Sequence, residues 1–398
     1  MIELRPYQKE ATDKGMEFFQ FGDPKEKPII VAPTAAGKSI YIGHMANELK
    51  DPVLVLQPSK ELLEQNYEKF RSYGGYASIY SASMGMRDIG HTTFATIGSI
   101  KGIPAQFAHV KNIMIDECHL VPPKAESMFM KFLSALPEVK VIGLTATAFR
   151  LKKYSDPFSR ETYSQVNILT RERPHFFNRF LHITQIDELY ALGFLCPVRY
   201  IRMQWDGNEL RVNTTGAEFT EQSITHALKV EKINERIPNV VKQSIEKGRK
   251  FRVVFVNSVA DAMDLAAKVP ESACVHAGTS KAEREMILHD FRWGKIKTVF
   301  NVNVLTIGFD FPALDTIIIA RPTMSLALYM QMIGRGIRKS PGKEDCVVVD
   351  MCGNSERFGE IDKMRYERDE LGKWVIRDDQ RVLSGVRLDK IKKRVTNS

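Results

Sequence analysis

The chain has 398 residues, of which 43% are hydrophobic and 26% are charged, and it carries a formal net charge of +9 with an isoelectric point near 9.1. These shares are typical of a folded globular protein and exclude a disordered chain or a disulfide scaffold. The length exceeds what one hydrophobic core usually organises, so we expect two domains. The positive charge is compatible with a polyanionic partner such as nucleic acid, but charge alone does not decide that question.

The cysteines and the apolar stretches exclude further classes of protein. The five cysteines have no C-x2-C pair and no regular spacing to histidine, so we expect no zinc and no disulfides. No apolar stretch approaches the ~20 residues that span a bilayer, and residues 1–6 lack the hydrophobic segment of a signal peptide. We therefore expect a cytoplasmic protein with no membrane partner.

Short β-branched runs alternate with helical stretches along the chain. Strands are predicted at 28–32, 53–56, 92–96, 112–116 and 139–144, and again at 251–256, 273–276, 298–301, 316–320 and 346–350. This alternation is typical of βαβ units around buried parallel sheets. The sequence therefore predicts an α/β protein with two sheets in tandem.

The remaining segments set the expected domain boundaries. Residues 149–208 mix basic and aromatic side chains and lack the regular spacing of strands, so we interpret them as a linker or insertion. Within this segment, residues 150–180 are either a substrate-binding wedge or the solvated face of a linker. Residues 220–248 should be helical, with Thr220 as N-cap and Gly248 as stop. We expect a first lobe at 1–195, including the insertion from about 150, a second lobe at 196–355, and a charged tail at 356–398 that is helical or partly mobile.

A phosphate-binding loop is predicted where the strand at 28–32 runs into a helix, through Ala32-Pro33-Thr34-Ala35-Ala36-Gly37-Lys38-Ser39. In such loops, backbone N–H groups and the helix N-terminus surround the phosphates, the lysine binds the β and γ phosphates, and the hydroxyl binds Mg²⁺. Ala32 replaces the first glycine of the strict G-x-x-x-x-G-K-[ST] pattern, and an ordinary strand-to-helix turn is the alternative. We predict that Thr34, Ala35, Ala36, Gly37, Lys38 and Ser39 bind ATP, with Ser39 as a metal ligand.

Two carboxylates follow the strand at 112–116, as Asp116-Glu117-Cys118-His119. The carboxyl ends of parallel strands are where α/β sheets bind ligands. Asp116 is suited to hold Mg²⁺, and Glu117 is suited to orient and deprotonate an attacking water. A solvated acidic turn is the alternative.

The order of these motifs resembles that of superfamily 2 helicases over about residues 1–355. The resemblance implies two tandem RecA-like P-loop NTPase domains, with parallel sheets flanked by helices, that hydrolyse Mg²⁺–ATP at their interface while they hold nucleic acid. It implies that Arg5 and Gln8 bind the nucleotide, with the Gln8 amide reading adenine. It also implies that Thr145 and Thr147 couple the two functions and sense His119. Ala35 stands where many of these helicases have a glycine, so we expect turnover to be affected more than nucleotide binding.

Two further motifs lie in the second series of strands. Residues 303–310 resemble the motif that contacts both ligands, so Gly308 and Asp310 are assigned to nucleotide. Residues 331–338 match the Q-x-x-G-R-x-x-R signature, and the resemblance assigns Gln331, Arg335 and Arg338 to catalysis. At helical i, i+3 spacing both guanidinium groups can face one partner, and across the cleft from Lys38 they would stabilise charge on the transferring phosphate.

Nucleic-acid contacts are assigned to polar residues at strand ends, since recognition of backbone phosphates needs only hydroxyls, amides and cations. Each of them alone is also an ordinary cap or turn residue. The set consists of Pro58, Ser59, Lys60, Thr96, Ser99, Asn257, Ser258, His276, Gly278 and Thr306.

Within the superfamily, residues 301–310, 321–323 and 331–338 look most like RadD-type DNA-repair helicases, although the cysteine-rich region of that group is absent from this sequence. We expect a monomeric, DNA-dependent ATPase, a helicase or translocase that unwinds or remodels single-stranded, forked or branched DNA in repair, recombination or replication-fork processing. The alternatives are an RNA helicase and a nucleotide-gated binding module that recruits a partner protein.

Overall fold

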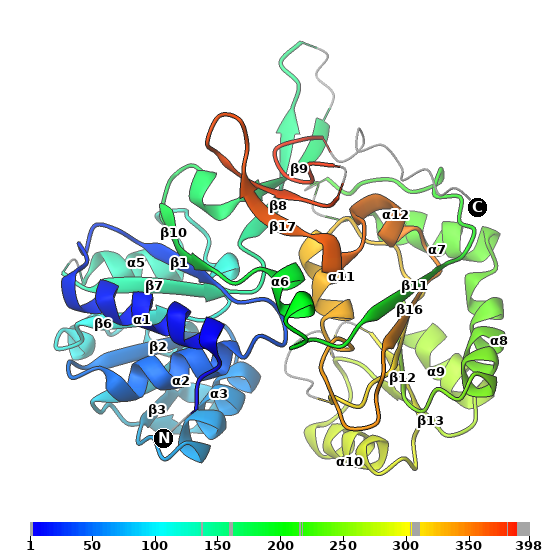
Figure 1. The fold of residues 1–398 in the computed structure, drawn as a ribbon, viewed down its shortest axis with the longest axis horizontal. Helices are drawn as coiled ribbons and strands as arrows, with labels where there is room; N and C mark the ends of the chain where they lie inside the picture. Colours follow the sequence, from blue (N-terminus) through cyan, green and yellow to red (C-terminus); the bar gives the residue numbers. More distant parts are fainter. Residues whose placement is uncertain are drawn as a thin grey trace. The chain divides into compact units, whose positions relative to one another are not determined.

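The computed structural model describes residues 3–136, 138–158, 162–214, 216, 218–302, 304, 311–379 and 381–387 (Figure 1). The chain divides into two compact units. The first unit comprises Met1–Arg150 and Asn167–Gln185, and the second comprises Leu151–Val166 and Ile186–Ser398. Among the described residues, no helix combines the length and the apolar character needed to cross a membrane.

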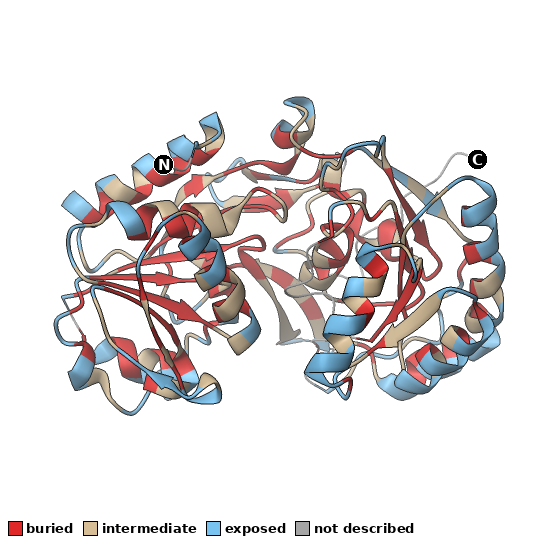
Figure 2. Cartoon of the chain, turned by 90° about the horizontal axis from the view of Figure 1, so that it is seen from below, coloured by how far each residue is buried: buried red, intermediate tan, exposed pale blue. Residues whose placement is uncertain are grey.

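The first unit is built on an eight-stranded sheet whose strands are parallel except at the β3–β4 edge. Its central strands are apolar and buried along their whole length, as the red strands in Figure 2 show, because helices cover the sheet. The strands, in spatial order, are β10 (Arg179–Ile183), β1 (Pro28–Val31), β7 (Lys140–Thr145), β6 (Asn112–Ile115), β2 (Val53–Gln57), β5 (Thr92–Thr96), β3 (Ser78–Ser81) and β4 (Met86–Arg87).

The order of strands positions the predicted motifs. Strand β7 lies between β1, which leads into the phosphate loop, and β6, which leads into the acidic pair. Val31 of β1 pairs with Thr145 of β7, and Ile115 of β6 pairs with Gly143. Because the strands are parallel, all three motifs emerge at the same edge of the sheet.

Helices of the first unit connect these strands. They are α1 (Pro6–Phe21), α2 (Lys38–Glu48), α3 (Lys60–Ser72), α4 (Ile97–Ile100) and α5 (Met128–Ser134), with short 3-10 turns η1 (Ala82–Met84), η2 (Pro104–Phe107), η3 (Cys118–Leu120) and η4 (Leu169–Arg171). The phosphate loop leads directly into α2, which begins at Lys38.

The second unit is built on a six-stranded parallel sheet. Its strands, in spatial order, are β11 (Val198–Arg202), β16 (Cys346–Asp350), β15 (Thr316–Ile319), β12 (Arg252–Phe255), β14 (Thr298–Asn301) and β13 (Ser272–Val275). Its helices are α6 (Ile186–Ala191), α7 (Glu221–Val230), α8 (Ile233–Glu246), α9 (Val259–Lys268), α10 (Lys281–Arg292), α11 (Leu326–Ile333) and α12 (Asn354–Phe358), with the 3-10 turn η5 (Ile361–Lys363). The ten predicted strands are therefore confirmed, with ends that shift by one residue at most. Thr220 is the N-cap of α7, and Gly248 follows α8 with a φ of +77°, so both predicted helix signals are confirmed.

The interpretation of residues 149–208 as a linker or insertion without strand rhythm is wrong. The segment contains β8 (Phe149–Ser155) and β9 (Thr162–Ile168), which form a two-stranded sheet, and it supplies β10 to the first sheet and β11 to the second. Both β10 and β11 are edge strands, and each is only partly buried. Such strands lack the continuous apolar run that marks a central parallel strand.

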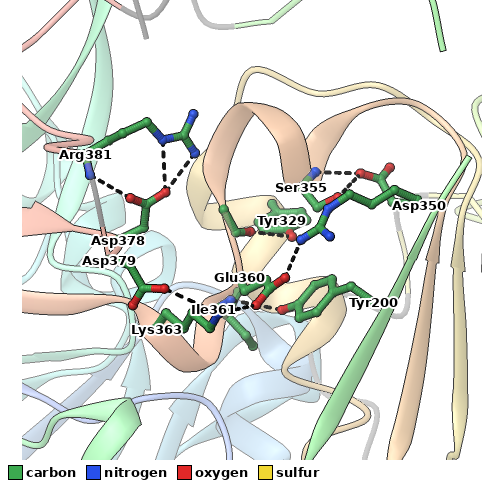
Figure 3. A network of polar contacts seen from close by, with 12 residues as sticks. Tyr200, Tyr329, Asp350, Ser355, Glu360, Ile361, Lys363, Asp378, Asp379 and Arg381 are labelled. Carbon is green, nitrogen blue, oxygen red and sulfur yellow. Dashed lines mark hydrogen bonds and ion pairs between the residues drawn. The ribbon is translucent and has the colours of Figure 1, made fainter. Parts of the chain in front are cut away.

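The charged segment after residue 355 packs onto the second unit as far as it is described. Ser355 donates to Asp350 at the end of β16 with an Oγ–Oδ2 distance of 2.7 Å, and the backbone N–H of Ile361 donates to the Tyr200 hydroxyl at 2.9 Å (Figure 3). The segment then forms a hairpin of β17 (Arg365–Arg368) and β18 (Trp374–Arg377). The sequence predicts a helical or partly mobile tail, but its described residues, 356–379 and 381–387, lie mostly in turns, loops and strands.

Candidate active site

The phosphate loop has two residues in the left-handed backbone region, Ala35 with a φ of +72° and Gly37 with a φ of +89°. Glycine adopts this conformation without strain, whereas alanine does so at a cost. Gly37 has a second reason to lack a side chain, since a Cβ there would lie 2.8 Å from Nε2 of Gln8. Ala32 is buried, and its N–H donates to the Thr145 carbonyl at 2.9 Å, which fixes the start of the loop against β7.

Gln8 is a buried residue of α1, only 2% exposed, and it supports the phosphate loop. Its Nε2 donates to the carbonyl of Ala36 at 3.0 Å, and its Oε1 accepts the backbone N–H of Arg5 at 3.0 Å. The hydroxyl of Tyr7 donates to the same Ala36 carbonyl at 3.1 Å. The structure therefore brings Gln8 to the loop, with its amide bonded to protein groups, and Arg5 bonds to Gln8 and Tyr7, which contact the loop. Its assignment as an adenine reader stays a prediction.

Lys38 lies between the two predicted catalytic carboxylates. Its Nζ is 2.7 Å from Oδ1 of Asp116 and forms a second ion pair with Oε1 of Glu117. Burial alone would lower the pKa of Lys38, but the two carboxylates outweigh burial and raise it. Burial likewise favours a neutral Glu117, yet Lys38 and His119 outweigh it and lower the pKa of this carboxyl group. Lys38 and Glu117 are therefore both charged at neutral pH.

Glu117 has a left-handed backbone with a φ of +47°, which is unusual for a residue with a side chain. Its Oε2 lies 3.2 Å from Nδ1 of His119, and the same Nδ1 lies 2.8 Å from Oγ1 of Thr145. Thr145 Oγ1 in turn accepts the backbone N–H of Thr147 at 3.0 Å. His119 therefore contacts the motif at 145–147 and the acidic pair, while the coupling role of Thr145 and Thr147 stays a prediction.

Asn66 of α3 belongs to this site, although the sequence analysis missed it. Ser39 Oγ donates to Asn66 Oδ1 at 2.5 Å, and Asn66 Nδ2 donates to Oδ2 of Asp116 at 2.7 Å. A signal was present in the sequence. The buried residues Leu62, Leu63 and Phe70 mark one face of α3, and Asn66 occupies that face at the spacing of an apolar residue.

The oxygen donors near Lys38 fit a nucleotide-bound Mg²⁺ rather than a resident metal ion. In the part of the chain that the structure describes, no group of three or more His, Cys, Asp or Glu side chains could hold a metal. Mg²⁺ usually binds through one or two protein oxygens together with phosphates and water. The Ser39 hydroxyl and the Asp116 carboxylate, both bonded to Asn66, supply such a pair.

Arg150 is a second residue of the first unit that the sequence analysis did not place here. It follows the motif at 145–147 and donates through its guanidinium group to the carbonyls of His119 and Val121. Glu172 holds the same group with an Nη1–Oε2 distance of 2.7 Å. Arg150 therefore fixes the backbone that follows the acidic pair.

The predicted nucleic-acid contacts of the first unit gather at the carboxyl ends of β2 and β5, where Gln57 pairs with Thr96. Ser59 caps α3 by accepting the backbone N–H of Leu62 at 3.4 Å. Pro58, Ser59 and Lys60 follow β2, and Thr96 and Ser99 follow β5, so the structure brings these five residues to one region of the sheet edge.

The 3-10 turn η1, which the sequence analysis missed, joins these two groups. Lys60 Nζ donates to the Ser83 carbonyl at 3.2 Å, and the Ala82 N–H donates to Ser99 Oγ at 2.9 Å. Thr96 Oγ1 lies 2.8 Å from the same Ser99 oxygen. Hydroxyls and a lysine at one sheet edge can bind backbone phosphates, which carry no base identity.

In the second unit, the predicted helical spacing of Arg335 and Arg338 is wrong. Helix α11 ends at Ile333 and carries Gln331, which is half-buried, but Arg335 lies in a turn and Arg338 in a bend. The reason is packing at Gly336, where a Cβ would lie 2.3 Å from Sγ of Cys346. The chain must leave the helix in order to pass this close to β16.

Lys343 holds the turn that carries both arginines. Its Nζ donates to the carbonyls of Gly336 at 2.5 Å, Arg338 at 2.9 Å and Pro312 at 3.0 Å. Burial lowers the pKa of Lys343. This role could not be predicted from the sequence, because a lysine in a polar loop is normally solvated.

The remaining predicted residues of the second unit follow β12 and β13. Ser258 caps α9 by accepting the backbone N–H of Asp261 at 3.1 Å, and Asn257 precedes it. Nδ1 of His276 accepts the N–H of Gly278 at 3.1 Å, which makes a tight turn. Both pairs lie at the carboxyl edge of the sheet. Thr306, Gly308 and Asp310 lie outside the described residues.

Comparisons with known proteins match both units. The family description "Type III restriction enzyme, res subunit" matches residues 1–150, and "Helicase conserved C-terminal domain" matches residues 229–340. The protein named "Putative ATP-dependent helicase IRC3" of Saccharomyces cerevisiae is 24% identical over 376 residues, which cover 88% of this chain and 52% of that protein. This chain therefore spans about half the length of that relative.

Two further relatives extend the comparison. The DNA 3'-5' translocase XPB2 of Sulfurisphaera tokodaii is 22% identical over 382 residues, which cover 85% of this chain and 79% of that protein. The solved structure of the ATP-dependent Type ISP restriction-modification enzyme LlaBIII bound to DNA has a TM-score of 0.61 at 14% identity, over 88% of this chain and 28% of that chain. The predicted fold of two tandem RecA-like domains is confirmed.

Proposed function

The chain belongs to helicase superfamily 2, and from this premise we propose that it is an ATP-dependent translocase that acts on DNA. The single observation that carries the proposal is the position of Lys38 between Asp116 and Glu117, beside Ser39, at the carboxyl edge of the first sheet. A simple structural ion pair would need one carboxylate, whereas this arrangement matches the charges that phosphoryl transfer requires.

The proposed roles follow from the chemistry of the side chains. Lys38 exchanges its carboxylate partners for the phosphates of ATP, and Ser39 with Asp116 would hold Mg²⁺, which when bound neutralises charge on the phosphates. Glu117, held ionised, orients the attacking water and accepts its proton. Gln331, Arg335 and Arg338 of the second unit complete the set by stabilising charge on the transferring phosphate.

DNA is favoured over RNA as the partner. Two similar proteins, a DNA translocase and a restriction-modification enzyme bound to DNA, cover 85% and 88% of this chain and support this choice, whereas a similar RNA helicase covers 73%. The resemblance to RadD-type helicases supports a role in repair, recombination or fork processing. In this proposal the hydroxyls and lysine around η1 hold the phosphates of the DNA backbone, while Thr145 and His119 couple that grip to hydrolysis.

The partner is tested by ATP turnover with Mg²⁺, measured alone and with single-stranded, forked and four-way-junction DNA and with RNA, at one stated salt concentration. We expect each DNA to raise turnover, with strand displacement measured in parallel on the fork. Stimulation by RNA alone would overturn the DNA assignment.

The chemistry is tested by Glu117→Gln. This variant should bind ATP normally and lose turnover by about 10²- to 10⁴-fold, the usual contribution of a general base. Glu126→Gln is the matched control, because Glu126 is exposed on the segment that follows the acidic pair. Equal and very slow hydrolysis by wild type and Glu117→Gln would instead favour a nucleotide-gated module that does not depend on turnover.

A further inference from the structure

Asn66 is a buried polar residue on a helix face that is otherwise apolar. It is 4% exposed and lies on α3 together with the buried side chains of Leu62, Leu63 and Phe70. A buried amide is costly unless its hydrogen bonds are made, so its retention on this face calls for a specific set of partners.

The direction of each hydrogen bond follows from the chemistry of the partners. Oδ1 of Asp116 is ion-paired with Lys38, and the NH₂ group of Asn66 donates to Oδ2 of the same carboxylate. The amide oxygen of Asn66 then faces Ser39, whose hydroxyl must donate its proton. Both lone pairs of the Ser39 oxygen therefore remain available to a third partner.

These two partners are the oxygen donors that the proposed function assigns to Mg²⁺. A metal ligand usually needs a hydrogen-bonded neighbour that fixes its orientation, and loss of that neighbour commonly weakens metal binding about 10- to 100-fold. We propose that Asn66 is a positioning residue, which orients the Ser39 hydroxyl and the Asp116 carboxylate together as ligands of nucleotide-bound Mg²⁺. This inference rests on the proposed function, since it concerns the same site.

Few other side chains could perform this task at position 66. An aspartate would place a second carboxylate against Asp116 and could not donate to it, and a leucine of similar size would leave both partners without their hydrogen bonds. The amide of asparagine accepts from the hydroxyl through its oxygen and donates to the carboxylate through its nitrogen. Asn66 thus acts through Ser39 and Asp116 and does not itself contact the metal.

The test measures metal binding directly. Mn²⁺ replaces Mg²⁺ as a paramagnetic probe, and its affinity is measured by electron paramagnetic resonance in the presence of a non-hydrolysable ATP analogue. We expect Asn66→Leu to weaken Mn²⁺ binding about 10- to 100-fold. Affinity for the same analogue in excess EDTA should stay within twofold of wild type. Glu68→Leu, an exposed position on the same helix, is the matched control and should change neither value.

Unchanged Mn²⁺ affinity in Asn66→Leu would overturn the inference, as would an equal loss of Mn²⁺ and analogue binding, which indicates a merely structural role. If the leucine variant does not fold, Asn66→Ala removes the same two hydrogen bonds from a smaller side chain and is assessed by the same two affinities. Failure of the wild-type protein to bind the analogue at all would count against the proposed function instead.

Discussion

Nδ1 of His119 lies 2.8 Å from Oγ1 of Thr145, and this contact joins the loop after β6 to the end of β7. The same histidine nitrogen lies 3.2 Å from Oε2 of Glu117. A change at residues 145–147 therefore reaches the proposed general base through one side chain. In a coupling motif, such a contact would transmit the state of one ligand to the other.

Thr145→Val should separate hydrolysis from nucleic-acid binding. Valine keeps the shape but cannot bond to His119, so we expect the stimulation of ATP turnover by DNA to fall roughly tenfold, within the range of ordinary coupling free energies. The measurement is the ratio of turnover with and without DNA. Thr93→Val is the control, because Thr93 is equally buried but its hydroxyl bonds to the backbone N–H and carbonyl of Gly90, away from His119. A wild-type ratio in Thr145→Val would contradict the coupling role.

Lys343→Met should loosen the turn that carries Arg335 and Arg338. Methionine fills similar space but leaves three carbonyls without their donor, so the free energy of unfolding of the second unit should fall by about 1.5–3 kcal/mol. We also expect ATP turnover to fall while nucleotide affinity is kept. Urea unfolding and turnover check both, and Lys339→Met at an exposed position serves as control. Unchanged turnover would show that the turn does not depend on Lys343.

His182 should make the first unit sensitive to mild acid. Burial lowers the pKa of His182 below its usual value of 6.5, with Glu10 opposing that shift and Lys14 adding to it. The unfolded chain therefore takes up a proton more readily than the native one, and the stability present above pH 6.5 is lost as the pH falls. Urea midpoints at pH 7.5 and 5.5 should differ less in His182→Gln than in wild type. The exposed His109→Gln should behave as wild type, and a wild-type pH dependence in His182→Gln would refute the assignment.

Ala35→Gly should stabilise the phosphate loop. Alanine with a φ of +72° is strained, and glycine removes that strain while adding freedom to the unfolded chain, so the net gain should be about 0.5–1 kcal/mol. Ala36→Gly is the control, since Ala36 is buried without a left-handed backbone and should be destabilised. Thermal unfolding of both variants decides the matter, and a less stable Ala35→Gly would contradict the strain argument.

The central strands and the first-unit site could be predicted because their signals are local. Strands such as β1, β2 and β6 are continuous apolar runs, and the residues that follow them must meet at one sheet edge. The edge strands β10 and β11 could not be found in this way, since each shows a mixed pattern that a linker also shows. Their pairing depends on long-range contacts that no short window contains.

Three residues with a role near the predicted motifs could not be identified from the sequence patterns, for different physical reasons. Asn66 forms hydrogen bonds to residues on two other elements of the fold. Arg150 and Lys343 both donate hydrogen bonds to backbone carbonyls. Carbonyl partners leave no side-chain signature in the sequence. The helical spacing of Arg335 and Arg338 failed because the close approach of Gly336 to Cys346, a contact between distant residues, ends the helix.

Helix α3 connects the two proposed ligand sites of the first unit, because it contacts residues of both. Its first residue, Lys60, bonds to η1 among the proposed DNA contacts, and Asn66, about 9 Å further along the axis, holds Ser39 and Asp116. A displacement of the helix at Lys60 would therefore also displace Asn66. We expect DNA to alter the affinity for the metal–nucleotide complex, and by thermodynamic reciprocity the metal–nucleotide complex must alter the affinity for DNA by the same factor.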